Sequence, residues 1–251
     1  MTYSIIAKDL ATGALGIAVA SRFFACGSLV PFIGRCSAIA SQSFVNPMWG
    51  VEGLPRLEAG ESAASVLADF IARDGGQALR QAHMLDANGQ SIAHTGTDCT
   101  DWCGHKLGDG WSVAGNMLAG PAVVADTASA WCNGGDLAFP DRLLAAMQAG
   151  EDAGGDKRGR QAAGLLIHRG QDYPWLDLRV DDHADPLSEL RRLLAVARER
   201  LLFVNEVLPT AENFSGATAR DDVDRRIAEA EDRRSAAGRK TESFASLPKG
   251  S

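Results

Sequence analysis

The second residue of the chain is a threonine that directly follows Met1. Removal of Met1 would leave Thr2 with a hydroxyl and a free α-amine on the same residue. The pKa of an α-amine lies at about 7.7–8.0, so part of it is unprotonated at neutral pH and can accept the hydroxyl proton. Thr2 is therefore the best candidate nucleophile, on the condition that Met1 is removed. The alternative is an ordinary Met-Thr start with no catalytic role, and a retained Met1 would block the amine.

A glycine-rich basic segment at 154–160 is the densest cluster of unusual residues in the chain. Its glycines allow a tight turn and a close approach to a ligand, and its cations could form a positive pocket. The candidate ligand-binding residues are Gly155, Asp156, Lys157, Arg158 and Arg160. The segment lacks the Gly-Lys-Ser/Thr order of a phosphate-binding P-loop. In the alternative interpretation, its charges pair with the acidic stretch 177–182.

Two further groups of side chains carry the donor atoms of metal sites. Residues 181–183 offer two carboxylates and an imidazole, but adjacent residues of a strand point to opposite faces. Cys99, Cys103 and His105, with His94 upstream, could bind zinc, although the second Cys-x2-Cys pair of common zinc sites is absent. Free or buried cysteines are the favoured interpretation, so we predict neither a metal nor a cofactor.

The composition limits the possible partners. A net charge of −7 disfavours nucleic acid, because phosphate binding requires a positive field. No apolar stretch approaches the roughly 20 residues of a membrane span, and the N-terminus lacks the basic region of a signal peptide. Five irregularly spaced cysteines do not form a disulfide framework. We therefore expect a cytoplasmic location and neither membrane nor nucleic acid as a partner. Cys26 is a second candidate nucleophile, but no base accompanies it in the sequence.

The strands are predicted mainly from short apolar runs. Residues 3–7 and 15–21, with turn residues between them, predict a hairpin at the start of the chain. Alternation of small apolar and polar residues predicts a third strand at 36–44. An Asn-Gly turn predicts a second hairpin within 81–93. Further strands are expected at 111–117, 161–168 and 176–180.

Helical spacing of apolar residues appears between the strand regions. It covers 54–73, where Gly60 interrupts the run. Two more helices are predicted near 121–132 and 138–149, and Gly150 is expected to end the second. Antiparallel hairpins with helices between them indicate an α+β fold in which helices pack on sheets.

The end of the chain differs in composition from the rest. A long amphipathic helix is expected from Pro186. Residues 217–240 are mostly charged residues and alanine, which predicts an exposed helix or a disordered tail. We therefore predict a folded domain at 1–208 and a charged tail at 209–251.

Several segments together resemble an uncharacterised bacterial family of Ntn-hydrolase-like proteins, the domain of unknown function 1028. The matching segments are 2–7, 12–22 (TGALGIAVASR), 46–47, 80–81, 94–96, 115–118, 154–161 (GGDKRGRQ) and 177–183. The two long motifs are specific. The resemblance implies a four-layer αββα sandwich with mostly antiparallel sheets and with the nucleophile at the start of the first strand. It implies little about the substrate, because a shared fold does not fix function.

Residues near Thr2 also have candidate roles. The predicted hairpin places Arg22 at the end of its second strand, beside Thr2, where it could hold a substrate carboxylate or lower the pKa of the amine. The alternative for Arg22 is a surface ion pair at the end of a strand. Ser21 stands where proteasome-type relatives carry an acidic residue. Asn116 and Asn46 are candidate donors to an oxyanion, and for each the alternative is a turn former.

The sequence supports three functional hypotheses. The first is an Ntn-type amidohydrolase that cleaves an amide or peptide bond of a small molecule or peptide. The second is a non-catalytic binding protein of the same fold that holds an anionic metabolite, which the missing acidic residue at Ser21 favours. The third is a homo-oligomer with a structural role. If the first is right, Thr2, Arg22, Asn116 and the 154–160 segment should border one cleft.

Overall fold

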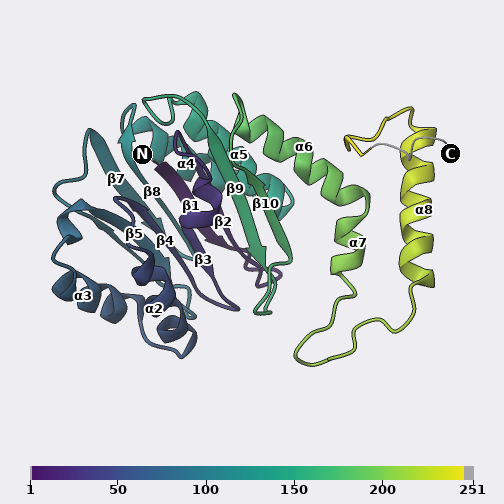
Figure 1. Cartoon of the computed structure of the whole chain (residues 1–251), viewed down its shortest axis with the longest axis horizontal. Coiled ribbons are helices and arrows are strands. Elements are labelled where there is room, and N and C mark those ends of the chain that lie inside the picture. The colour runs from purple at the N-terminus through teal and green to yellow at the C-terminus, as the bar shows by residue number, and fades with distance from the viewer. Residues whose placement is uncertain (1, 246–251) are drawn as a thin grey trace. The chain divides into compact units, whose positions relative to one another are not determined.

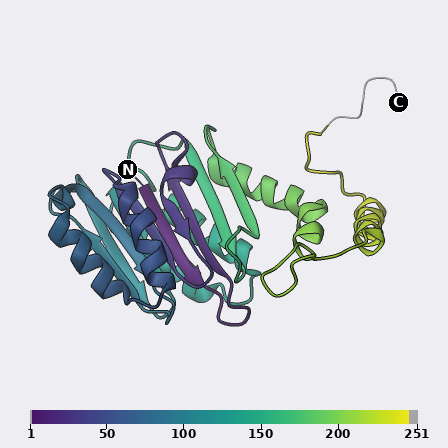
Figure 2. The same cartoon turned by 60° about the horizontal axis from the view of Figure 1, so that its bottom comes forward.

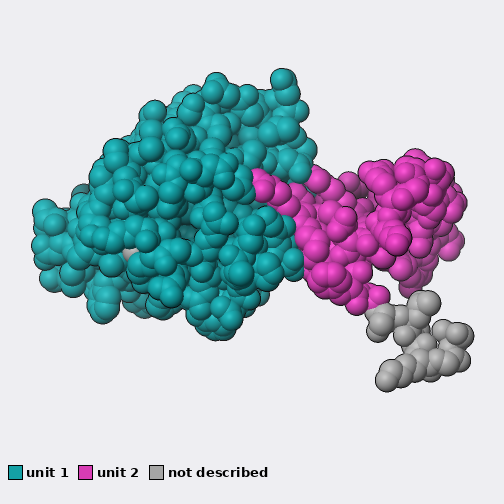
Figure 3. Space-filling model, turned by 90° about the horizontal axis from the view of Figure 1, so that it is seen from above, with its two compact units in different colours: residues 1–190 teal, residues 191–251 magenta. Residues whose placement is uncertain are grey.

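The computed structural model describes residues 2–245 and divides into two compact units, residues 1–190 and 191–251. Figure 3 gives each unit its own colour. Both β-sheets belong to the first unit, and their paired strands are all antiparallel within the described residues. The fold is therefore α+β with antiparallel sheets.

The larger sheet has six strands in the order β10-β9-β2-β1-β8-β7. They are β1 (Thr2–Lys8), β2 (Leu15–Ser21), β7 (Trp102–Gly108), β8 (Trp111–Leu118), β9 (Ala162–His168) and β10 (Leu176–Val180). The first hairpin forms the centre of this sheet, because β9 pairs with the outer side of β2 and β8 pairs with β1. The start of β1 therefore lies between two neighbouring strands.

The smaller sheet has four strands in chain order, and two helices cover one of its faces (Figure 1). The strands are β3 (Pro31–Ile33), β4 (Ala38–Ser43), β5 (Arg80–Leu85) and β6 (Ser91–Thr95). The helices α2 (Pro47–Glu58) and α3 (Ala63–Arg73) connect β4 to β5. Trp49, Leu57 and Phe70 of these helices pack with Ile39 and Met84 of the sheet.

The other face of the smaller sheet packs against the larger sheet. Ile6, Ile17 and Val19 of the larger sheet share one buried cluster with Ala40 and Leu85 of the smaller sheet. Because successive side chains of a strand point to opposite faces, every second residue of β1 points into the layer between the two sheets. Thr2 and Ser4 belong to that series.

A second pair of helices covers the remaining face of the larger sheet (Figure 1, Figure 2). These helices are α4 (Ala122–Asn133) and α5 (Phe139–Asp152), which contact β8, β1 and β2. Tyr3 points to this side, and its hydroxyl donates to the carbonyl oxygen of Met147 in α5 at 2.9 Å. Helices thus cover the outer face of each sheet, and the inner faces meet.

The structure confirms the two predicted hairpins and the strands expected from 111, 161 and 176. It corrects the sequence analysis at several elements. The strands β3 and β7 and the short helix α1 (Cys26–Leu29) were not predicted. The first helical run begins at Pro47 rather than at 54, and Gly60 separates α2 from α3 as expected. Gly150 does not end α5, which continues to Asp152.

The second unit is helical. The boundary between the units falls within α6 (Pro186–Glu199), which is followed by α7 (Leu201–Asn205) and α8 (Asp221–Ala236). Of the two alternatives predicted for 217–240, an exposed helix or a disordered tail, the structure has the helix over most of the range. This helix, α8, buries only Val223 and Ile227. No helix in the described part of the chain is both long enough and apolar enough to cross a membrane.

Candidate functional site

The candidate nucleophile lies at the start of the central strand β1. Thr2 is buried, with 6% of its surface exposed, and it faces Asn116 of β8 in register. On the other side, Ser21 ends β2 next to the Tyr3–Ala20 pair. The Thr2 hydroxyl donates to Ser21 Oγ at 3.2 Å. Opposed residues of antiparallel strands project to the same side, so three of the predicted site residues share the inner face of the larger sheet.

Asp156 attaches the glycine-rich segment to this site. It forms an isolated bridge with Leu118, the last residue of β8. Its buried carboxylate accepts from the backbone N–H of Arg22 at 2.8 Å and from that of Arg158 at 2.9 Å. Because Arg22 directly follows β2, one carboxylate joins the ends of β2 and β8 to the 154–160 segment. Asp156 therefore positions the segment, and its carboxylate is engaged within the chain.

The glycines of the segment adopt the backbone conformation for which glycine is favoured. The φ angles are 113° at Gly154, 50° at Gly155 and 109° at Gly159, a region that costs other residues steric strain. The sequence predicts a tight turn at this segment. These glycines let the segment turn beside the end of β8, where Asp156 bridges Leu118.

The cations of the segment pair with carboxylates of the chain. The ion pairs join Lys157 to Asp101, Arg158 to Asp156 and Arg160 to Glu151. The alternative interpretation was therefore right that these charges are paired, but the partners lie outside 177–182. Arg22 differs from them, because its side chain is exposed and has no ion pair with any residue that the structure describes. It is the cation at this end of β2 that remains available to a ligand.

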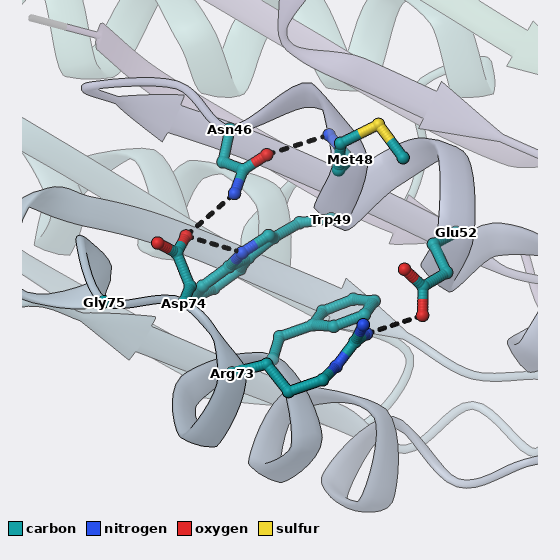
Figure 4. Close-up of a pocket in the computed structure, with 8 residues that line it drawn as sticks. Asn46, Met48, Trp49, Glu52, Arg73, Asp74 and Gly75 are labelled. Atoms are coloured by element: carbon teal, nitrogen blue, oxygen red, sulfur yellow. Dashed lines mark hydrogen bonds and ion pairs between the residues drawn. The ribbon is translucent and has the colours of Figure 1, made fainter.

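Asn46 lies elsewhere, on the helix-covered side of the smaller sheet (Figure 4). Its Oδ1 accepts from the Met48 N–H at 3.0 Å and caps α2, and its Nδ2 donates to Asp74 at 2.8 Å. Both belong to a pocket of about 250 Å³ that also includes Trp49. Although burial opposes the shift, hydrogen bonds from Asn46 and its neighbours lower the pKa of Asp74 to about 2. The structure thus uses Asn46 as a helix cap and does not place it with Thr2.

Beside Thr2, a chain of polar side chains that was not predicted from the sequence lies between the two sheets. Its members are fully buried: Ser4, Gln42, Gln81, His83, Ser112 and Asn116. Buried polar groups require hydrogen-bond partners, and these residues form several hydrogen bonds with one another. No local pattern identified them, because a glutamine and a histidine that alternate with Ala82 and Met84 are typical of a strand with one solvated face. Their burial comes from the larger sheet, which packs against this face.

Gln81 fixes the direction of the hydrogen bonds in this chain. Its Nε2 donates to the backbone carbonyls of Gly115 at 2.8 Å and Gly104 at 3.2 Å. A carbonyl can only accept, so Gln81 Oε1 must point the other way. That oxygen accepts from Gln42 Nε2 and from Asn116 Nδ2, each at 2.9 Å. The orientation of the Asn116 amide therefore follows from two backbone carbonyls.

The hydrogen-bond partners of His83 likewise determine its tautomer. Ser4 Oγ donates to Gln42 Oε1 at 2.6 Å, so Ser4 must accept from His83 Nε2, which lies 2.8 Å away. His83 Nδ1 then accepts from Ser112 Oγ at 2.8 Å. Burial, with a smaller effect of His105, lowers the pKa of His83 to about 3. His83 is thus a neutral link with its proton on Nε2.

Asn116 leaves one buried atom without a partner. Its Nδ2 is engaged by Gln81 Oε1, while its Oδ1 has no hydrogen-bond partner among the described residues. Asn116 is fully buried and lies opposite Thr2. Gln81 thus engages one of the two Nδ2 hydrogens of Asn116, and a role of Asn116 as a donor to an oxyanion stays a prediction.

The thiols and the possible metal ligands do not form an alternative site. Burial, followed by the charge of Asp181, raises the pKa of the Cys26 thiol to about 12, so its reactive thiolate is scarce at neutral pH. Within residues 2–245, no three His, Cys, Asp or Glu side chains converge as metal ligands would. Neither 181–183 nor the set around Cys99 and Cys103 is therefore gathered for a metal.

Comparisons with known proteins agree with this part of the fold. The model of a family of unknown function, DUF1028, matches residues 2–190. A crystal structure of a Silicibacter pomeroyi protein with the same family assignment is 30% identical in sequence. The match covers 87% of this chain and 99% of that chain, with a TM-score of 0.79. No functionally curated protein matches the chain. The matched residues include Thr2, Arg22, Asn116 and the 154–160 segment.

Proposed function

The chain belongs to the DUF1028 family of unknown function, and we propose that it is an N-terminal-nucleophile amidohydrolase acting on a small amide or peptide bond. The observation that carries the proposal is the place of Thr2. It opens the central strand β1, and its hydroxyl bonds Ser21 on a face lined with buried polar groups. A four-layer αββα arrangement of the Ntn type, a cytoplasmic location and the absence of a cofactor belong to the same proposal.

The reaction would use both functional groups of Thr2. After removal of Met1, the α-amine takes the hydroxyl proton while Oγ1 bonds to the carbonyl carbon of the amide. The C–N bond then breaks, the leaving amine takes that proton, and an ester on Thr2 remains. Water hydrolyses the ester by the same proton transfer and releases the acid. Gln81 already engages one of the two Asn116 Nδ2 hydrogens, and this proposal assigns the oxyanion to a backbone N–H.

Arg22 would orient the substrate. The cations of the 154–160 segment are held by carboxylates of the chain, whereas the Arg22 side chain is exposed and follows directly after Ser21. A guanidinium binds a carboxylate through two parallel hydrogen bonds. We therefore assign the recognition of a substrate carboxylate to Arg22, and a positioning role to the segment.

A non-catalytic binding protein is the second candidate. The observation that favours it is Ser21, a neutral residue where an acidic one is expected beside an N-terminal nucleophile. In that case Arg22 would hold an anionic metabolite, and Thr2 would line the site without reacting. The paired cations of the 154–160 segment weaken this candidate, because they leave less positive charge for an anion than the sequence implied.

Covalent labelling tests the proposal. The intact mass of the purified protein should lack one methionine, and a β-lactone probe should acylate Thr2 Oγ1, as located by peptide mapping. Thr2→Ser should keep part of the labelling, since it retains both the hydroxyl and the amine. Thr2→Ala should abolish it without loss of the fold, because the nucleophile is gone.

The matched control is Cys26→Ala, which removes the other nucleophile considered and should leave labelling intact. Labelling that persists in Thr2→Ala and disappears in Cys26→Ala would refute the proposal. Retention of Met1 in the purified protein would also refute it, because an acylated nitrogen is no base.

A further inference from the structure

The Oδ1 atom of Asn116, which has no hydrogen-bond partner among the described residues, points to a further role of this side chain in the site. A buried acceptor without a hydrogen bond is unfavourable, so such an atom in a native structure calls for a donor. Asn116 and Thr2 are paired residues of adjacent strands. Side chains in such pairs start only about 4.5–5.5 Å apart at Cβ. Thr2, the residue whose amine would be freed by removal of Met1, is therefore the residue opposite Asn116 on β1.

We infer that Asn116 is a positioning residue whose Oδ1 accepts a hydrogen bond from the α-amine of Thr2, and that Gln81 enforces this orientation. The inference rests on the proposed function for the presence of a free amine. It gives Asn116 a task different from the oxyanion donor that the sequence analysis expected. Gln81 acts through Asn116 and does not touch the reacting atoms.

The direction of the Asn116 amide carries this argument. A reversed amide would place Oδ1 against Gln81 Oε1, where two acceptors would meet. Gln81 cannot reverse in turn, because its Nε2 donates to two backbone carbonyls, those of Gly104 and Gly115. The side of Asn116 that is turned away from Gln81 is therefore an oxygen. An amine N–H satisfies it, and an anion would not.

A hydrogen bond from the amine to Asn116 has a measurable consequence. Oδ1 accepts more strongly from the protonated amine than from the neutral amine, so the contact raises the pKa of the α-amine at this buried position. Loss of the acceptor should lower that pKa by about one unit or more, since hydrogen bonds to charged groups have that magnitude. The contact also restrains rotation of the amine beside the Thr2 hydroxyl.

The test measures the pKa of the Thr2 amine without any substrate. The chain is made as a cleavable fusion whose removal leaves Thr2 as the first residue, whatever happens to Met1 in the cell. Trace acetic anhydride is reacted at a series of pH values, and acetylation of the N-terminal peptide is followed by mass spectrometry. Asn116→Leu should lower the amine pKa by about one unit or more.

Gln42→Met is the matched control. Gln42 and Asn116 are equally buried and donate to the same Gln81 oxygen at the same 2.9 Å, so a general loss of packing would affect both variants alike. The amine pKa should be unchanged in Gln42→Met. If either variant fails to fold, Asn116→Ala and Gln42→Ala replace the pair.

The outcomes separate this inference from the proposed function. Equal shifts in the two variants, or no shift in Asn116→Leu, would overturn the positioning role even if the β-lactone labels Thr2. A selective shift in a protein whose Thr2 is never labelled would support the positioning role and refute the catalytic proposal.

Discussion

His83 lies between the two sheets, where its neighbours require the neutral imidazole. Burial lowers its pKa to about 3, whereas a histidine in the unfolded chain titrates at about 6.5. Below about 6.5 the unfolded state binds a proton that the folded state does not. The free energy of unfolding should therefore fall by about 1.4 kcal/mol per pH unit from about 6.5 toward about 3. Above about 6.5 this contribution is complete and constant.

Urea unfolding measures this effect at pH values from about 7 to about 4. His83→Gln should be less stable than the wild type at neutral pH, and the difference should shrink as the pH falls because the variant lacks the titrating group. Parallel curves for His83→Gln and the wild type would contradict the assignment of a neutral buried imidazole.

At the residue scale, the sequence could identify groups whose chemistry is local. Thr2 is a candidate because hydroxyl and amine share one residue, and the glycines of 154–160 required a special backbone that the structure contains. Gln81 and His83 could not be selected in the same way. Their importance comes from the second sheet, which buries them and connects them to Asn116. The pairing of Lys157 with Asp101 also depends on tertiary contacts that no local pattern specifies.

Among the elements, α5 shows how tertiary packing overrides a local rule. Gly150 was expected to end this helix, yet it lies within it. A Cβ at this position would lie 2.3 Å from Thr127 Oγ1 and 2.9 Å from Tyr3 Cε2. Glycine is therefore needed for close contact with α4 and β1. Gly150→Ala should destabilise the protein by about 1–3 kcal/mol through overpacking, although alanine alone would favour the helix by about 1 kcal/mol.

Chemical unfolding of Gly150→Ala and Thr127→Ala, alone and combined, tests this explanation. Removal of Thr127 Oγ1 takes away the nearest clash, so the double variant should be more stable than the sum of the two single effects. If the Gly150→Ala variant is instead more stable than the wild type, helix propensity outweighs overpacking, and the contact with Tyr3 is loose.

Other elements differ in how clearly the sequence predicts them. The strands β1 and β2 were predicted because their apolar residues are short, β-branched and bounded by turn residues. β7 was missed because Trp102–Gly108 lies at the edge of the sheet and combines glycines with exposed polar residues. The start of α2 could have been found, because Asn46 caps the helix and Pro47 occupies its first turn.

On the scale of the whole molecule, the buried clusters that position the site lie in the first unit. The cluster between the sheets and the cluster beneath α2 and α3 contain no residue beyond Leu166. In the second unit, α8 buries only Val223 and Ile227. The predicted division at 208 stays a prediction, since the compact units divide at Leu190 and α6 continues past that point. A chain that ends at Leu208 keeps α6 and α7 entire and removes α8.

We expect the chain of residues 1–208 to fold and to retain labelling at Thr2. Its melting temperature should fall by no more than about 4 °C, because a loss of about 1 kcal/mol shifts a domain of this size by about 2–4 °C. Calorimetry and the β-lactone probe measure the two properties on one sample.

The control is a chain that ends at Ala153. It lacks β9, which leaves the edge of β2 exposed, so this chain should not fold. A larger fall in melting temperature for 1–208 would place part of the stability of the first unit in residues 209–251. Loss of labelling with an unchanged melting temperature would instead show that residues 209–251 contribute to the reaction at Thr2. The strands β1, β2 and β8 around Thr2 are complete in the full chain and in the 1–208 chain alike.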